Sequence, residues 1–120
     1  IGWTNYRDQW MSEGFAQLST SLYIQFVRKD IGKFNEFWEE QRQQIVEGTR
    51  ATNGIKPYTV GPVTQGFRLN TQKAGGAYRY LVYPKGAYIV HMIRMMMLDR
   101  KEGDAKFQAM MRDFVKTNYN

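Results

Sequence analysis

An amphipathic helix is encoded by the stretch Asp8-Gln9-Trp10-Met11-Ser12-Glu13-Gly14-Phe15-Ala16-Gln17-Leu18 and the residues that follow it. Its apolar positions recur at steps of three or four residues, at Met11, Phe15, Leu18, Leu22 and Phe26. Because an α-helix turns once every 3.6 residues, this spacing puts all of them on one face. Asn5 and Asp8 are suitable amino-terminal caps. The sequence therefore predicts a helix that begins near residue 8 and ends near Arg28-Lys29-Asp30.

Three more helices are predicted downstream. The second follows Gly32 and has Gly48 where a carboxyl-terminal cap belongs; its buried face comprises Phe34, Phe37, Trp38, Gln41 and Ile45. The third begins near Tyr83-Pro84, since proline suits a first helical turn, and its apolar face comprises Gly86, Val90, Ile93 and Met97. The last starts at Asp104 and carries the stripe Phe107, Met110, Met111, Phe114 and Val115.

Glycine and proline interrupt the segment of residues 49–77, which has no apolar periodicity. We predict a long loop there, and loops of this length in compact domains are usually functional or mobile. The chain is therefore expected to be all-α, with about four helices and this loop between the second and the third. Its 120 residues suffice for one domain or less.

The charge of the chain is uneven. The net charge is +6, and no acidic residue stands between Glu47 and Asp99, where seven lysines and arginines fall. Because they are scattered singly, we interpret them as a solvated face, or as a surface that meets acidic parts of a larger protein, and expect no nucleic-acid ligand. The absence of cysteine excludes disulfides and leaves the compartment open. No apolar run approaches the ~20 residues of a membrane span.

The first helix carries a motif that points to a metal site. The segment Asp8-Gln9-Trp10-Met11-Ser12-Glu13-Gly14-Phe15-Ala16 resembles the D-x-W-[LM]-N-E-G-F-A signature of the membrane alanine aminopeptidases, which are gluzincin zinc peptidases. The match departs from the usual pattern at Ser12, where asparagine is common. The glutamate of that signature is the third zinc ligand in the family, so the resemblance implies this role for Glu13. On spacing alone, Glu13 would be a half-exposed helical residue or an ion-pair partner.

A second motif follows in the order expected of the same family. The segment Tyr78-Arg79-Tyr80-Leu81-Val82-Tyr83-Pro84-Lys85-Gly86-Ala87 resembles its Y-x-K-G motif, with Pro84 at a variable position. The family's tyrosine hydroxyl stabilises the oxyanion that forms at the peptide carbonyl, and the resemblance implies this role for Tyr83. Tyr78 is an auxiliary candidate. Without the resemblance, both tyrosines would be interpreted as packing residues with a polar tip.

The resemblance extends over nearly the whole chain, so residues 1–120 correspond to the helical, carboxyl-terminal portion of a thermolysin-like catalytic domain. The family's H-E-x-x-H motif, with two zinc-binding histidines and the general base, would precede Ile1. The implied parent is a zinc enzyme that removes amino-terminal residues from peptides. The isolated chain, with one carboxylate ligand, is expected to be inactive and to bind no zinc. It also lacks an initiator methionine, which suggests a piece of a longer protein.

The remaining metal-binding residue types are interpreted as packing residues. His91 is the only histidine, and its helical neighbours Ala87 and Met95 are not zinc ligands. The four methionines at 92 and 95–97 could supply thioether ligands to copper, but helix-core packing is favoured because methionine fills irregular gaps.

A different class of function is kept as an alternative: a non-catalytic helical module whose basic central segment binds an anionic partner. Such a chain would bind nucleic acid or anionic lipid in a salt-sensitive way. Apolar helix faces that a larger domain would cover also predict self-association of the isolated chain. Neither the preferred amino-terminal residue nor the localisation follows from the sequence.

Overall fold

The computed structural model describes residues 3–119, and this part of the chain is helical, with no named β-strand. The predicted all-α class is confirmed. The α-helices are α1 (Gln9–Leu22), α2 (Ile31–Val46), α3 (Tyr78–Val82), α4 (Pro84–Met97) and α5 (Ala105–Asn118). The shorter segments are the 3-10 helices η1 (Tyr6–Asp8), η3 (Arg50–Thr52), η4 (Pro57–Thr59) and η5 (Val63–Leu69), and the π-helix η2 (Tyr23–Val27). The short α3 is the one described α-helix that apolar periodicity does not predict.

The first predicted helix corresponds to α1 followed by η2. Leu18 is buried, and Phe15 and Leu22 pack against the same core, as the spacing predicts. Phe26 is the exception, because its side chain is 54% exposed. The wider π-helical turn of η2 breaks the 3.6-residue repeat, which removes Phe26 from the face that α1 buries.

The second predicted helix corresponds to α2. The Asp30 carboxylate accepts a hydrogen bond from the backbone N–H of Lys33 at 2.9 Å and so caps the amino terminus. Trp38 and Gln41 are buried on the predicted face. Gly48 follows the capping residue Glu47 but does not adopt a left-handed conformation. Its backbone instead packs on Gly54, so this glycine permits a close approach rather than a turn.

The segment between α2 and α3 has a defined structure because several of its side chains are buried. Thr52, Pro57, Val63 and Ala74 are buried along it, and the segment forms the 3-10 helices η3, η4 and η5. Its end contributes to a second small core, whose buried members are Leu69, Ala77, Leu81 and Val82. The larger core comprises Leu18, Trp38, Ala87, Val90 and Phe107.

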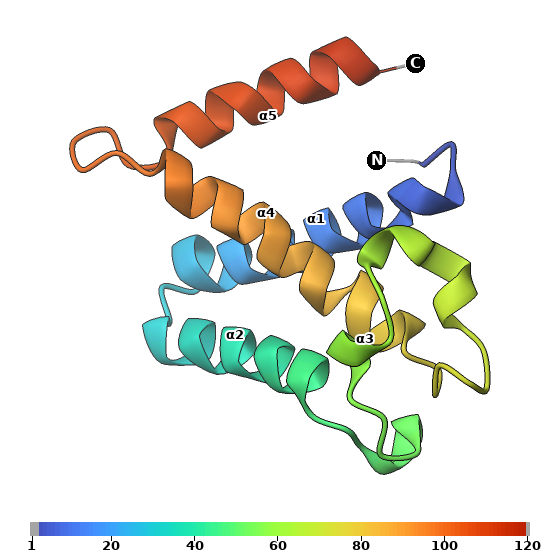
Figure 1. Ribbon diagram of the computed structural model, residues 1–120. Helices are drawn as coiled ribbons and strands as arrows, with labels where there is room; N and C mark the ends of the chain where they lie inside the picture. The colour runs from blue at the N-terminus through green and yellow to red at the C-terminus, as the bar shows by residue number, and fades with distance from the viewer. Residues whose placement is uncertain (1–2, 120) are drawn as a thin grey trace.

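Helices α1 and α4 cross with their backbones in contact. A Cβ atom on Gly14 would lie 2.6 Å from the carbonyl carbon of Gly86, and one on Gly86 would lie 2.7 Å from the carbonyl oxygen of Trp10. Only glycine permits this approach at both positions. Figure 1 shows α4 crossing α1, with α2 below them, and α4 contacts both α1 and α2.

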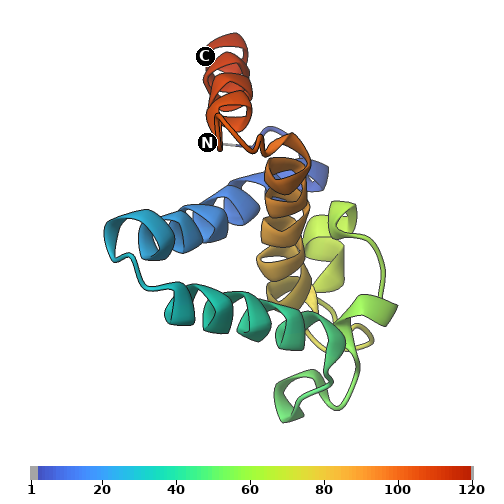
Figure 2. The same ribbon diagram turned by 90° about the vertical axis from the view of Figure 1, so that its left-hand side faces the viewer.

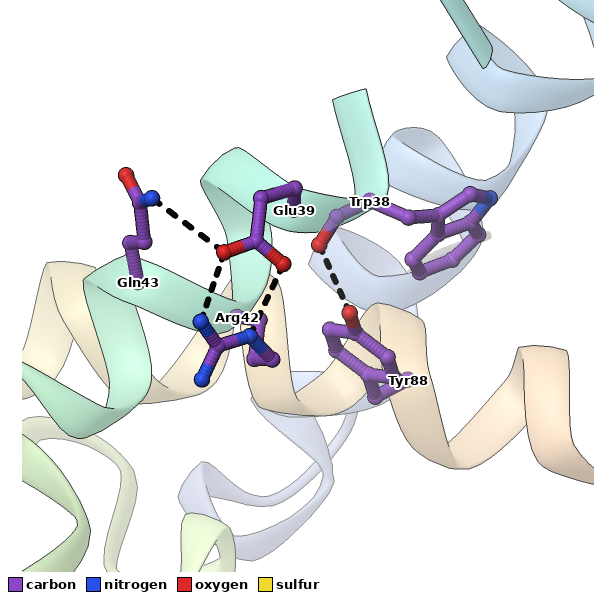
Figure 3. Close-up of polar contacts among 5 residues, drawn as sticks. All are labelled: Trp38, Glu39, Arg42, Gln43 and Tyr88. Atoms are coloured by element: carbon purple, nitrogen blue, oxygen red, sulfur yellow. Dashed lines mark hydrogen bonds and ion pairs between the residues drawn. The ribbon is translucent and has the colours of Figure 1, made fainter. Parts of the chain in front are cut away.

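Aromatic rings join α2 to α4. The Tyr88 hydroxyl donates a hydrogen bond to the carbonyl oxygen of Trp38 at 2.6 Å (Figure 3). The Trp38 indole stacks on His91, with ring centroids 4.1 Å apart and planes 16° apart. Figure 3 also shows Arg42 bound to Glu39 through two hydrogen bonds, but both side chains are about half exposed and this pair contributes little to stability.

The burial of His91 predicts a pH-dependent stability. Its pKa is lowered, first by burial and then by the charge of Arg94, while Asp104 acts in the opposite direction. The unfolded chain therefore binds a proton at a higher pH than the folded chain does. As the pH falls through the ordinary histidine pKa of 6.5, the free energy of unfolding is expected to decrease.

Urea denaturation between pH 7.5 and 5.5 measures this effect, with His91→Gln as the variant that cannot titrate. The loss of stability over this range is expected to be smaller in His91→Gln. An equal loss in both proteins would assign the pH dependence to other groups.

Helix α5 extends away from the other helices, as Figure 2 shows. A turn with paired backbone hydrogen bonds between Asp99 and Gly103 connects it to α4. Phe107 is the one buried residue of α5, and Val115, at the end of the predicted stripe, is exposed. Within residues 3–119, none of the helices combines the length and apolar character that crossing a membrane requires.

The methionines of α4 contradict the prediction that they fill the core. Met92, Met95 and Met96 are 59%, 48% and 83% exposed, and only Met97 packs against the core. The buried face of α4 instead carries the small residues Gly86 and Ala87, followed by Val90 and Arg94. Small residues let α4 approach α1 closely, and the methionines are left on the opposite side.

Candidate catalytic site

Glu13 lies on α1 directly before Gly14, the residue at which α1 crosses α4. The residue is partly buried. A side chain at position 14 would clash with the Gly86 backbone, so the glycine permits the close approach that places the neighbouring Glu13 near the start of α4.

Tyr83 lies at the junction of α3 and α4, where it ends one helix and caps the other. Pro84 begins α4 and lacks the N–H that would continue α3, so the chain changes direction at Tyr83. The Tyr83 carbonyl accepts the first hydrogen bond of α4, from the Ala87 N–H at 3.0 Å. The fully buried Leu81 and Val82 anchor the preceding turn in the second core. The junction therefore holds Tyr83 from both sides.

Glu13 and Tyr83 are brought together, although they are far apart in the sequence. The pKa of Tyr83 is raised, first because the phenol is partly removed from water, and then by the negative charge of the nearby Glu13 carboxylate. Arg79 acts in the opposite direction. The phenol is neutral near pH 7, as an ordinary tyrosine is, so its O–H can donate a hydrogen bond to a developing negative charge.

Tyr78, the auxiliary candidate, lies in the same place. Its ring meets the Tyr83 ring edge to face, with centroids 6.2 Å apart. The pKa of Tyr78 is raised by burial and then by the charges of Tyr83 and Glu13. All three residues that the sequence predicts for the site are thus neighbours in the fold.

Tyr83 and Tyr78 begin a row of contacting aromatic rings, called the aromatic row. It continues through Phe67 and Trp3, which the sequence does not mark as site residues. Phe67 stacks on Tyr78 with centroids 5.4 Å apart, and Trp3 meets Phe67 at 6.0 Å. Gln9 holds this row in place, because its buried amide oxygen accepts a hydrogen bond from the Phe67 N–H at 3.1 Å. No periodicity could reveal this contact, since Gln9 and Phe67 lie in different elements.

The donor set for a metal is incomplete in this part of the chain. Residues 3–119 contain no group of three or more histidine, cysteine, aspartate or glutamate side chains that could hold a metal ion together. Glu13 has the carboxylate chemistry that zinc accepts but supplies one donor, whereas a catalytic site uses three protein ligands. His91 stacks on Trp38 and packs against Phe34, as expected of a packing residue.

Comparison of the chain with protein-family models, with curated proteins and with solved structures finds no match in any of the three. The geometry around Glu13 and Tyr83 is therefore the basis for a functional assignment.

Proposed function

We propose that this chain is part of the catalytic domain of a zinc aminopeptidase, in which Glu13 is a metal ligand and Tyr83 stabilises the oxyanion. The supporting observation is the proximity of Glu13 and Tyr83, which the two sequence motifs single out independently. Hydrolysis of a peptide bond by zinc uses a carboxylate that binds the metal and a neutral hydrogen-bond donor beside the reacting carbonyl. Glu13 and Tyr83 would supply these two groups.

The residues of the chain have separate tasks in this mechanism. Zinc, when bound, would activate water and polarise the peptide carbonyl. Glu13 contributes one carboxylate ligand, and the other donors and the general base come from an H-E-x-x-H motif outside these residues. The Tyr83 hydroxyl donates a hydrogen bond to the carbonyl oxygen as that oxygen gains negative charge. Tyr78 packs against the Tyr83 ring and limits its movement.

Zinc titration and a peptidase assay test the assignment on two proteins, the 120-residue chain and a protein extended upstream in its natural reading frame. The extended protein is expected to bind zinc tightly and to release amino-terminal residues from peptides. The short chain is expected to do neither, because it contributes one ligand. Activity in the short chain, or an upstream sequence without H-E-x-x-H, would contradict the proposal.

The loss of the Tyr83 hydroxyl has a defined expected effect. In the extended, zinc-loaded protein, Tyr83→Phe should lower kcat about a hundredfold and change KM little, because the lost hydrogen bond forms mainly in the transition state. Tyr80→Phe, which removes the same atom from a neighbouring tyrosine of α3, is the control and should retain full activity. Steady-state kinetics on a short peptide measures both, and an unchanged kcat in Tyr83→Phe would remove this residue from the mechanism.

A second candidate function rests on the acid-free segment. Five of its seven basic residues are exposed: Arg50, Lys56, Arg68, Lys73 and Arg79. In a non-catalytic module they would bind an anionic partner, with an affinity that falls steeply as salt rises. Binding to a single-stranded RNA oligonucleotide or to anionic vesicles, measured at two salt concentrations, distinguishes this module from the peptidase.

A further inference from the structure

Two arginines that are distant in the sequence share one tyrosine ring beside the candidate catalytic site. The guanidinium carbon of Arg68, on η5, lies 4.9 Å from the centroid of the Tyr6 ring, and that of Arg7, on η1, lies 5.8 Å from it. The Arg7 Nε also donates a hydrogen bond to the Tyr6 hydroxyl at 3.3 Å. Both arginines are exposed, so a ligand can reach them.

The backbone fixes this arrangement. Gly66 has φ 50° and ψ −128°, and a Cβ atom there would lie 2.3 Å from the Tyr6 carbonyl oxygen. A residue with a side chain could not adopt this conformation against η1 without strain. Because Gly66 and the Gln9–Phe67 hydrogen bond hold η5 against η1, Arg68 is held beside Tyr6.

The charge of the two guanidinium groups is not neutralised by an ion pair. Among residues 3–119, no carboxylate lies within ion-pair distance of Arg7 or Arg68. The pKa of Arg7 is raised first by its hydrogen bond to Tyr6, and the neighbouring Asp8 carboxylate acts more weakly. The pKa of the Tyr6 phenol is lowered, first by the hydrogen bond from Arg7, and by the charges of both arginines against the effect of burial. This location therefore favours negative charge.

Arg68 comes directly after Phe67, the third ring of the aromatic row that starts at Tyr83. Phe67, the residue before Arg68, stacks on Tyr78, and Tyr78 contacts Tyr83, with ring steps of 5.4 and 6.2 Å. Followed from ring to ring, these two steps and one more residue span at most the length of roughly four residues of an extended peptide, at ~3.5 Å each. A short peptide could thus have its amino-terminal end at Glu13 and its carboxyl-terminal end near Tyr6.

We propose that Arg7 and Arg68 bind the carboxyl-terminal carboxylate of short peptide substrates, and so select oligopeptides of a few residues. Guanidinium groups bind carboxylates through paired, charge-assisted hydrogen bonds. This inference rests on the proposed aminopeptidase function, because it takes Glu13 and Tyr83 as the place where the amino-terminal peptide bond is cleaved.

Paired peptides test the inference on the protein extended upstream. A tetrapeptide with a free carboxyl terminus and the same tetrapeptide as its amide are compared by calorimetric binding to the metal-free protein and by hydrolysis with zinc. The free acid is expected to bind up to about fivefold more tightly, since pairing between exposed charges contributes no more than this. Peptides of ten residues should bind equally well as free acid and as amide, because their carboxyl-terminal end would lie beyond the arginines.

Three variants assign the effect to the arginines. Arg7→Gln and Arg68→Gln should each reduce the preference for the free acid, and Arg68→Lys should retain part of it. Arg100→Gln removes one positive charge from the turn at the opposite end of α4 (Figure 1) and should leave the preference unchanged. Thermal melts of each variant verify that the fold is intact.

The outcomes separate this inference from the proposed function. Equal binding and hydrolysis of acid and amide would overturn the carboxylate site and leave the peptidase standing. Preferential binding of the acid without hydrolysis of either peptide would retain the carboxylate site and overturn the peptidase. A preference that Arg100→Gln reduces as much as Arg68→Gln does would show a general charge effect and overturn the site.

Discussion

Replacing Gly14 with alanine is expected to lower the free energy of unfolding by about 3 kcal/mol, the upper part of the range for overpacked cores. The new methyl group would lie 2.6 Å from the carbonyl carbon and 2.8 Å from the carbonyl oxygen of Gly86. Both atoms belong to a backbone, so no side chain can rotate away, and α1 and α4 must separate. The higher helix propensity of alanine returns at most about 1 kcal/mol.

Gly32→Ala is the matched control, because Gly32 is exposed on α2 and its nearest neighbour would be the Asp30 carboxylate at 3.4 Å. This substitution should leave stability unchanged or raise it by about 0.5 kcal/mol through helix propensity. Urea denaturation of both variants gives the comparison. Equal stabilities would mean that the α1–α4 crossing is less tight than the structure has it. The peptidase activity that we propose for the extended protein should also be lower in Gly14→Ala, because Glu13 moves with α1 away from Tyr83.

Removal of Asp104 is expected to destabilise the protein by about 3 kcal/mol, as is typical of breaking a buried ion pair. The Asp104 carboxylate accepts two hydrogen bonds from Arg94, at 2.9 and 2.6 Å, and the Arg94 side chain is only 4% exposed. In Asp104→Ala the guanidinium would stay buried without a counter-charge. The same substitution would loosen the attachment of α5, since Phe107 is the one residue that α5 buries.

Two further variants test whether the stability lost in Asp104→Ala comes from leaving the buried Arg94 without a counter-charge, or from removing any ion pair. Lys106→Ala removes the exposed ion pair with Asp99, at 3.4 Å, and should cost less than about 1 kcal/mol. The double variant Arg94→Met/Asp104→Ala leaves no charge unpaired and should be more stable than Asp104→Ala alone. If Asp104→Ala and Lys106→Ala prove equally stable, the Arg94–Asp104 pair is not buried in solution.

The candidate site was accessible from the sequence only in part. Glu13, Tyr83 and Tyr78 stand out through motifs, because a motif records residue types at fixed local spacing. The supporting contacts of Gln9 with Phe67, and of Arg68 with Tyr6, join segments with no fixed spacing between them. Such pairs form only when the whole chain has folded, so no local pattern predicts them.

Sequence alone determined the all-α class, the approximate extents of α1, α2, α4 and α5, and the residues worth testing as a site. Helical periodicity and caps are local properties, and they suffice for these conclusions. Tertiary structure alone decided which apolar faces are covered. Arg94 is buried while Met96 is exposed on the same helix, because α4 approaches its neighbours through small residues and a paired charge. Burial depends on what each face meets, and that is set by contacts between distant segments.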